Sequence, residues 1–296
     1  MAASADADIR RLLGNITDPR QDIAGVSLSQ TRLMGIVNVT PDSFSDGGDF
    51  ADAESAVAHA RRLVAEGADF VDLGAESTRP GAEAVSEAEE LSRIRPVLER
   101  LRGLPAAISV DTRKVSVMRG AIEGGAKVIN DVSALTHDAQ ALQTAAALRC
   151  PVVLMHAKGD PLTMQDNPIY ADVLLEVYDA LQTRIEAAEA AGIERQLLIA
   201  DPGIGFGKTI AHNLALLAGI GLFHALGVPI LLGVSRKRFI GVVTGQTDPK
   251  SRMLGSIGAA LGAASQAVQM LRVHDVSETR QALDGWRASV AGRGPP

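Results

Sequence analysis

The chain has 296 residues, of which 46% are hydrophobic but only 3% aromatic. This length allows one large α/β domain, and the aliphatic composition suits a core of valine, isoleucine and leucine, as in a barrel. The formal net charge of −6, without a dense lysine or arginine stretch, argues against nucleic acid as a partner. The single cysteine, Cys150, excludes a disulfide within the chain.

The distribution of apolar residues also argues against a secreted protein and against a membrane-spanning one. Residues 1–14 lack the apolar core of a signal peptide, and no stretch reaches the roughly 20 apolar residues of a membrane span. The most apolar stretch, 254–268, is rich in glycine and alanine and predicts a close-packed helix. We therefore expect a cytoplasmic protein with no membrane partner.

Short β-type runs alternate with longer helical stretches from about residue 31 onward. The predicted helices are 53–66, 86–101, 170–191 and 276–288, and glycines 67, 103 and 192 follow the first three as stop signals. The predicted strands are 33–39, 70–74, 107–110, 127–129, 152–155, 197–200, 230–234 and 270–273.

Alternation of this kind predicts a parallel sheet, and about eight strands is the number of a (β/α)₈ TIM barrel. The alternative is a doubly wound open sheet, because a strand count does not show closure. We predict one barrel domain over residues 31–290. Residues 1–30 fit the pattern less well and are predicted to form an N-terminal extension that plugs or covers the barrel floor.

Polar or glycine-rich groups follow nearly every predicted strand. In a parallel barrel these positions meet on one rim, where barrel enzymes place their chemistry. A single aspartate after a strand is commonly a helix cap, but eight such endings together predict a site. They are Asn38, 76–79, Asp111, 130–131, His156, Asp201, 235–237, and Arg272 with His274.

The residue types at this rim point to a flat heterocycle and a phosphate group. Asp111, Asn130 and Asp201 offer acceptors and an amide for the N–H edges of an aminopterin. Asn38 has a carbonyl oxygen suited to Mg²⁺. Cations for a pyrophosphate are supplied by Arg79, Lys237, Arg272 and His274.

Two irregular segments flank the predicted site. Residues 40–48 are polar and follow the first strand, which is typical of a mobile lid. Residues 201–208 are rich in glycine but match neither the Walker nor the dinucleotide spacing, so we interpret them as backbone that approaches a flat ligand closely. His156 is a weaker candidate for a catalytic base or a metal ligand, because no cluster of histidine, cysteine and carboxylate residues has the spacing of a zinc site.

These motifs resemble those of the dihydropteroate synthase family. Residues 34–48 (MGIVNVTPDSFSDGG) resemble the first family signature, and residues 74–82 (GAESTRPGA) resemble the second. Shorter matches follow in the family's order at 109–112, 129–132, 201–208, 235–237 and 272–276. The resemblance extends over roughly residues 31–280.

This resemblance implies a transferase of folate biosynthesis. Members condense 6-hydroxymethyl-7,8-dihydropterin pyrophosphate with 4-aminobenzoate, giving 7,8-dihydropteroate and pyrophosphate. They are (β/α)₈ barrels, usually homodimers, and they use Mg²⁺. Sulfonamides would compete with 4-aminobenzoate.

The resemblance also implies residue roles by matched position. Asp111, Asn130, Asp201 and Lys237 would hold the pterin, Asn38 the Mg²⁺, and Arg272 with His274 the pyrophosphate. The expected catalytic residues are Asp111, Asp201, Lys237, Arg272 and His274. The aminobenzoate pocket would comprise Thr40, Pro41, Phe44, Thr78, Arg79 and Pro80, and the remaining substrate contacts are Met155, Phe206 and Arg238.

The sequence departs from the family pattern in three places. At Ala267, where glycine is common, we expect a difference in packing only, whereas the roles at the other two places stay open. Residues 155–161 differ after the fifth strand, around His156. Arg238 replaces a common serine and would either pair with the aminobenzoate carboxylate or point outward.

Two other functions remain as alternatives. A pterin-binding methyltransferase would share the aspartate and asparagine contacts but need a corrinoid partner. A non-catalytic pterin-binding paralogue would have lost loop or phosphate residues, whereas Asn38, Arg79, Arg272 and His274 are all present.

Overall fold

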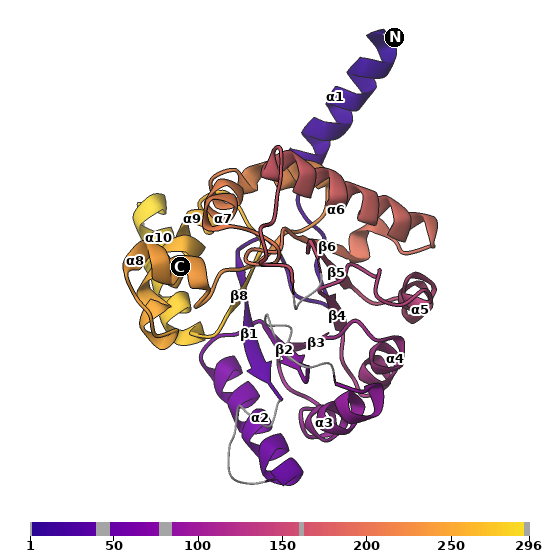
Figure 1. The fold of residues 1–296 in the computed structure, drawn as a ribbon, viewed down its shortest axis with the longest axis vertical. Coiled ribbons are helices and arrows are strands. Elements are labelled where there is room, and N and C mark those ends of the chain that lie inside the picture. Colours follow the sequence, from indigo (N-terminus) through magenta and orange to yellow (C-terminus); the bar gives the residue numbers. More distant parts are fainter. Residues whose placement is uncertain (1, 40–47, 77–84, 160–162, 293–296) are drawn as a thin grey trace.

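Eight parallel strands alternate with helices along the chain (Figure 1). The structure, a computed structural model, describes residues 2–39, 48–76, 85–159 and 163–292. Each predicted strand is present, with ends that differ from the prediction by at most two residues. The strands are β1 (Arg32–Asn38), β2 (Phe70–Gly74), β3 (Ala107–Asp111), β4 (Val128–Asp131), β5 (Val152–Met155), β6 (Leu198–Asp201), β7 (Leu231–Gly233) and β8 (Met270–Val273).

The sheet closes on itself. Its strand order is β6-β5-β4-β3-β2-β1-β8-β7, so β6 and β7 are its two ends. A parallel bridge joins Ala200 to Ile230, and the Ala200 amide donates to the Pro229 carbonyl at 2.9 Å. The predicted (β/α)₈ barrel is therefore confirmed, and the alternative of an open doubly wound sheet is wrong.

Helices surround the barrel, as Figure 1 shows. The predicted helix 170–191 begins three residues later, because the Asp172 carboxylate caps it by accepting from the Leu174 amide at 2.9 Å. The α-helices are α1 (Ala2–Thr17), α2 (Gly48–Ala65), α3 (Glu87–Arg100), α4 (Val115–Glu123), α5 (Ala141–Leu148), α6 (Val173–Ala190), α7 (Ile210–Ala218), α8 (Arg238–Thr244), α9 (Met253–Ala264) and α10 (Val276–Ala291). Short 3₁₀ helices are η2 (Arg195–Leu197), η3 (Ile220–Leu226) and η4 (Lys250–Arg252).

None of the helices in the described part of the chain has the length and apolar character needed to cross a membrane.

The lower half of the barrel interior is a closed apolar layer. Alternate residues of a strand face the same side, so one residue near the start of each strand points inward. These are Met34, Phe70, Ala107, Val128, Val153, Ile199, Leu231 and Met270, which form one buried cluster. A second and larger core lies between the strands and the surrounding helices.

The N-terminal segment contributes to this floor. Ile23 and Leu28 are buried in the same cluster, and Ile23 pairs with Val26 in an antiparallel bridge. Helix α1 precedes this segment and projects away from the barrel (Figure 1). Residues 23–28 thus plug the end of the barrel opposite the predicted site.

Candidate active site

One step further along each strand, the inward positions change from apolar to polar. Two residues beyond the floor layer, the strands carry Asp72 on β2, Ser109 on β3, Asn130 on β4, Asp201 on β6 and Arg272 on β8. The strand register aligns Asp111 with Asn130 and Gly233 with Arg272. The strand-end residues predicted from the sequence therefore meet in one place above the floor.

Arg272 is the centre of this polar layer. Its Nε donates to Asp72 Oδ2 at 2.6 Å, and its Nη2 donates to Asp111 Oδ2 at 3.1 Å. The Asn130 amide donates to the same Asp72 oxygen at 3.0 Å. One guanidinium group thus connects strands β2, β3 and β8 across the barrel.

Asp72 was not among the residues singled out in the sequence. It is completely buried and accepts from both Arg272 and Asn130. A carboxylate inside the apolar run 70–74 was an available signal, because a buried charge requires a partner. The identity of that partner depends on barrel closure, since Asp72 and Arg272 are 200 residues apart.

Asp111 presents an unsatisfied acceptor to the site. Its Oδ1 is buried without a hydrogen-bond partner, although Oδ2 is paired with Arg272. Burial raises the pKa of Asp111 from 3.8 to about 8, against the opposing effect of Arg272. Because buried polar atoms are rarely left unpaired, this oxygen is suited to accept an N–H group of a ligand.

We predict a measurable pH dependence from Asp111. The unfolded carboxyl group loses its proton near its ordinary pKa of 3.8, whereas the folded one retains it to about pH 8. Between these values the folded state binds more protons, so the free energy of unfolding falls as pH rises, by at most about 1.4 kcal/mol per unit. Asp111→Asn should remove this component, and urea unfolding at pH 5.5 and 7.5 measures it.

The control for this prediction is Asp284→Asn, which changes an exposed carboxylate on α10. Without ligand, the unfolding free energy of Asp284→Asn should fall with rising pH as steeply as that of the wild type. An Asp111→Asn variant whose unfolding free energy follows the wild-type pH dependence would contradict the prediction.

Asp201 and Lys237 are the second set of oppositely charged groups in the site, and each affects the pKa of the other. Asp201 is buried and its Oδ1 accepts from the Gly203 amide at 2.7 Å. The Lys237 ammonium donates to the Ile204 carbonyl and lies 4.8 Å from the centroid of the Phe206 ring. Burial raises the pKa of Asp201 and lowers that of Lys237 to about 8, while the opposite charge of each partner counteracts both shifts.

Buried Lys208 and half-buried His156 support the glycine-rich segment 201–208 through a shared hydrogen bond. The Lys208 ammonium donates to His156 Nδ1 at 2.9 Å and to the Phe206 carbonyl at 3.0 Å. Burial, reinforced by Lys208, lowers the pKa of His156 to about 3, so its ring is neutral and accepts this hydrogen bond. His156 therefore supports the loop, and the sequence offered no signal for its pairing with Lys208.

Gly203 is required by the path of the chain. Its φ is +66°, and a Cβ atom there would collide with the His156 carbonyl oxygen. We expect Gly203→Ala to lower the free energy of unfolding by about 2–4 kcal/mol, measured by urea unfolding. Gly285→Ala is the control, since its Cβ would meet no atom within 4 Å and should cost nothing.

The other predicted residues occupy different environments. His274 lies at the end of β8, where its Nδ1 is 3.0 Å from the Ser235 hydroxyl. Asn38 is partly exposed at the end of β1, and Met155 is buried at the end of β5. Arg238 is exposed at the first position of α8.

Two neighbouring side chains in the run 235–237 point in different directions. Arg236 has a φ of +59° and forms a bidentate ion pair with Asp275, with Nε 3.0 Å from Oδ2. Its neighbour Lys237 points into the site instead.

Six predicted contacts lie outside the described residues: Thr40, Pro41, Phe44, Thr78, Arg79 and Pro80.

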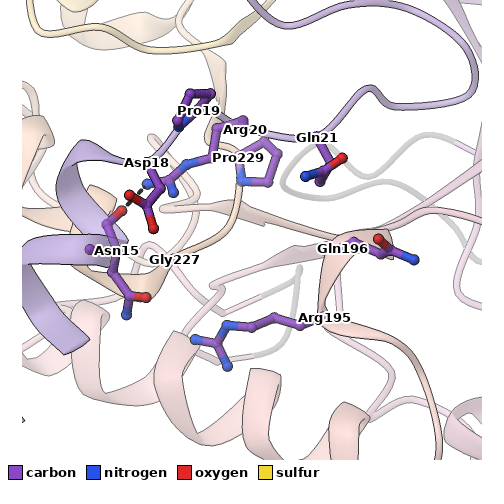
Figure 2. Close-up of a pocket in the computed structure, with 10 residues that line it drawn as sticks. Asn15, Asp18, Pro19, Arg20, Gln21, Arg195, Gln196, Gly227 and Pro229 are labelled. Carbon is purple, nitrogen blue, oxygen red and sulfur yellow. Dashed lines mark hydrogen bonds between the residues drawn. The ribbon is translucent and has the colours of Figure 1, made fainter.

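A separate cavity of about 310 Å³ lies at the opposite end, where the strands begin (Figure 2). There Arg20 Nη2 donates to the His224 carbonyl at 2.9 Å, and Asn15 Nδ2 donates to the Ala225 carbonyl at 2.8 Å. These contacts attach the end of α1 to η3. The lining is Gly14, Asn15, Asp18, Pro19, Arg20, Gln21, Arg195, Gln196, Gly227 and Pro229. None of the predicted site residues is included, so this cavity is not the candidate active site.

Comparison with known proteins agrees with this arrangement. The sequence model described as "pterin binding enzyme" matches residues 34–274. The chain belongs to the pterin-binding enzyme family. The matched region begins in β1 and ends at His274, so it contains most of β1, all of β2 to β8 and every predicted site residue.

Relatives within the pterin-binding enzyme family specify the subgroup. The dihydropteroate synthase of Neisseria meningitidis serogroup C is 46% identical over 266 residues, covering 89% of this chain and 94% of that protein. The dihydropteroate synthase of Escherichia coli K12 is 44% identical over 269 residues, covering 90% and 95%. The resemblance inferred from the sequence motifs is confirmed.

A solved structure shows the same fold. Dihydropteroate synthase from Xanthomonas albilineans, in a complex with 4-aminobenzoic acid, superposes with a TM-score of 0.87 at 52% identity. The match covers 93% of this chain and 99% of that one. The same bacterial enzyme has also been solved with 7,8-dihydropteroate, with a TM-score of 0.83 at 50% identity.

Proposed function

We propose that the chain is a transferase that joins 6-hydroxymethyl-7,8-dihydropterin pyrophosphate to 4-aminobenzoate, giving 7,8-dihydropteroate and pyrophosphate. The observation that carries this proposal is the unpaired, buried Asp111 oxygen beside Asn130 and the Arg272 guanidinium. An aminopyrimidine edge supplies the N–H groups that such a carboxylate needs.

The carboxylates account for activation of the pterin. When pyrophosphate leaves the methylene carbon, positive charge develops on the pterin ring. N–H donors of the bound pterin would favour the ionised forms of Asp111 on β3 and Asp201 on β6, whose negative charge would then stabilise the positive charge on the ring. The neutral amino group of 4-aminobenzoate then forms the new C–N bond and releases a proton, so no strong protein base is required.

The cations account for departure of the pyrophosphate. Arg272 uses Nε and Nη2 for Asp72 and Asp111, whereas its Nη1 makes no hydrogen bond to any residue that the structure describes. That nitrogen and the His274 ring, oriented by Ser235, would bind phosphate oxygens. Lys237, near Phe206, would contact the pterin ring.

The described residues at this rim could supply part of the coordination of a Mg²⁺ ion. Asn38 offers an amide oxygen at the end of β1, and within the described residues that side chain has no hydrogen-bond partner. No group of three or more histidine, cysteine, aspartate or glutamate side chains in the described parts could hold a metal. Mg²⁺ commonly binds through one or two protein oxygens, water and substrate phosphates, and there it neutralises phosphate charge. We propose Asn38 as its protein ligand.

The activity is tested by following pyrophosphate release from the dihydropterin pyrophosphate, with and without 4-aminobenzoate and with and without Mg²⁺. We expect release that depends on both additions, with 7,8-dihydropteroate detected chromatographically. Binding of the pterin without product would contradict the proposal and favour a non-catalytic paralogue. Methyl transfer from methyltetrahydrofolate to a corrinoid partner would instead favour the methyltransferase.

Three further features are proposed for the protein in its cell. Sulfonamides should inhibit it, as implied by a Yersinia pestis dihydropteroate synthase solved in a sulfonamide drug complex, 43% identical with a TM-score of 0.86. A cytoplasmic location agrees with Cys150, a buried free thiol whose pKa burial raises to about 11. A homodimer is supported by exposed apolar side chains on neighbouring helices.

We predict that the dimer forms through α7, α8 and α9. Helix α9 packs against both of the others, and these helices carry exposed Leu214, Val242, Val243 and Leu254. Leu254 is 76% exposed, so Leu254→Arg should leave the fold intact but convert the dimer to a monomer in light scattering at micromolar concentration. Leu175→Arg, on α6, is the control and should remain dimeric; a monomeric wild type would refute the prediction.

A further inference from the structure

Four successive carbonyl groups in the glycine-rich segment 201–208 each accept a hydrogen bond from a side chain. Gly203, Gly205 and Gly207 have φ of +66°, +86° and +62°, so the backbone here follows neither a helix nor a strand. Carbonyl groups outside regular structure need other partners, and these side chains supply them. The pairs in chain order are Lys237 to Ile204, Gln165 to Gly205 at 2.6 Å, Lys208 to Phe206 at 3.0 Å, and Tyr170 to Gly207 at 2.9 Å.

Two of these four donors come from the chain between β5 and α6. Gln165 and Tyr170 donate to the carbonyls on either side of Phe206. The two loops also touch through their backbones, since a Cβ atom at Gly207 would collide with the Lys158 carbonyl oxygen. The peptide groups that flank Phe206 are therefore held from outside the segment.

The ring of Tyr170 is held in place independently of its hydroxyl group. The Lys158 ammonium lies 4.1 Å from the ring centroid, and the His212 ring meets it edge to face, with centroids 4.9 Å apart. His212 in turn caps α7 by accepting from the Thr209 amide at 3.2 Å. Burial, reinforced by Glu176, raises the pKa of Tyr170 to about 12, so the hydroxyl group stays protonated and donates.

Phe206 lies between the two held carbonyls and next to a residue of the site. The Lys237 ammonium is 4.8 Å from the centroid of the Phe206 ring. Rotation of the peptide group at Gly207 would turn this ring relative to Lys237. A hydrogen bond that prevents the rotation lowers the cost of ordering the ring when a ligand binds.

We propose that Tyr170 is a positioning residue for the pterin: through its hydrogen bond to the Gly207 carbonyl, it holds the Phe206 ring in the orientation that binding requires. The inference rests on the proposed function, in which Lys237 contacts the pterin and Phe206 contacts substrate. Tyr170 itself touches neither substrate in this proposal. Its loss should therefore weaken pterin binding without slowing the reaction of the bound substrates.

The test uses the full chain with Tyr170→Phe, which removes only the hydroxyl group and keeps the ring beside Lys158 and His212. We expect the Kd for the dihydropterin pyrophosphate, measured by calorimetric titration, to rise about 5-fold, as for the loss of one hydrogen bond. The kcat at saturating concentrations of both substrates should stay within about 2-fold of the wild type. Tyr178→Phe is the matched control and should keep the wild-type Kd, because Tyr178 packs against Phe223 with ring centroids 6.3 Å apart.

A double-mutant cycle tests whether Tyr170 acts through Phe206. Phe206→Leu should weaken pterin binding on its own, and adding Tyr170→Phe should then change the Kd by less than about 2-fold, because the positioned ring is already gone. Additive effects of the two substitutions would overturn the proposal. So would a wild-type Kd in Tyr170→Phe, or an equal increase in Tyr178→Phe.

Hydrogen exchange separates failure of this inference from failure of the proposed function. If the wild type binds no dihydropterin pyrophosphate, the proposed function fails, but exchange at the Phe206 amide still reports on the Tyr170 contact. That amide donates to the Gly203 carbonyl at 3.1 Å. Its exchange should accelerate in Tyr170→Phe and not in Tyr178→Phe; an unchanged rate would show that Tyr170 does not hold Phe206.

Discussion

Replacement of Arg272 by methionine is expected to lower kcat/KM for dihydropteroate formation about 1,000-fold, equivalent to about 4 kcal/mol. Methionine retains much of the volume but leaves the buried carboxylates of Asp72 and Asp111 without their shared cation. It also removes the guanidinium proposed to bind the departing pyrophosphate. The measurement is pyrophosphate release as a function of dihydropterin pyrophosphate concentration at saturating 4-aminobenzoate.

Arg280→Met is the matched control for this prediction. Arg280 is similarly exposed and pairs with Asp69 at 2.6 Å, but it lies on α10 outside the barrel interior. We expect its kcat/KM to remain within 3-fold of the wild type. An Arg272→Met enzyme within 10-fold of the wild type would show that the guanidinium holds the barrel together without acting on the substrate.

Asp201→Asn is expected to weaken binding of the dihydropterin pyrophosphate about 100-fold, or about 2.7 kcal/mol. The amide keeps an oxygen for the Gly203 amide, so the local turn should survive. It loses the negative charge that strengthens hydrogen bonds from the pterin and that offsets the nearby Lys237. Direct calorimetric titration with the substrate measures the Kd in the absence of 4-aminobenzoate.

Asp131→Asn separates this effect from the general cost of changing a buried carboxylate. Asp131 is also buried at a strand end, but its oxygens accept from the amides of Ser133 and Leu135 at 2.7 and 2.9 Å. This control should lose stability while keeping the wild-type Kd for the pterin. Equal weakening in both variants would contradict a specific role for Asp201.

Much of the architecture was determined by local patterns in the sequence. Alternating apolar runs and helical stretches identified all eight strands, because burial on both faces of a parallel strand requires continuous apolar residues. Gly67 and Gly192, with φ of +102° and +95°, terminate helices where the sequence predicted. The rim was also predictable, since the carboxyl ends of parallel strands must lie at one end of a closed barrel. That reasoning brought Asp111, Asn130 and Arg272 together.

Only the tertiary structure decided which of these residues pair. Asp72 with Arg272, and Lys208 with His156, are far apart in sequence, and their contacts depend on the pairing of β1 with β2 and β8 and of β5 with β6. The positive φ of Arg236 turns that side chain to Asp275 and leaves Lys237 to enter the site. Local propensity specifies where an element begins and ends. The partner of a buried charge is determined by how the whole chain packs, because an unpaired buried charge is costly.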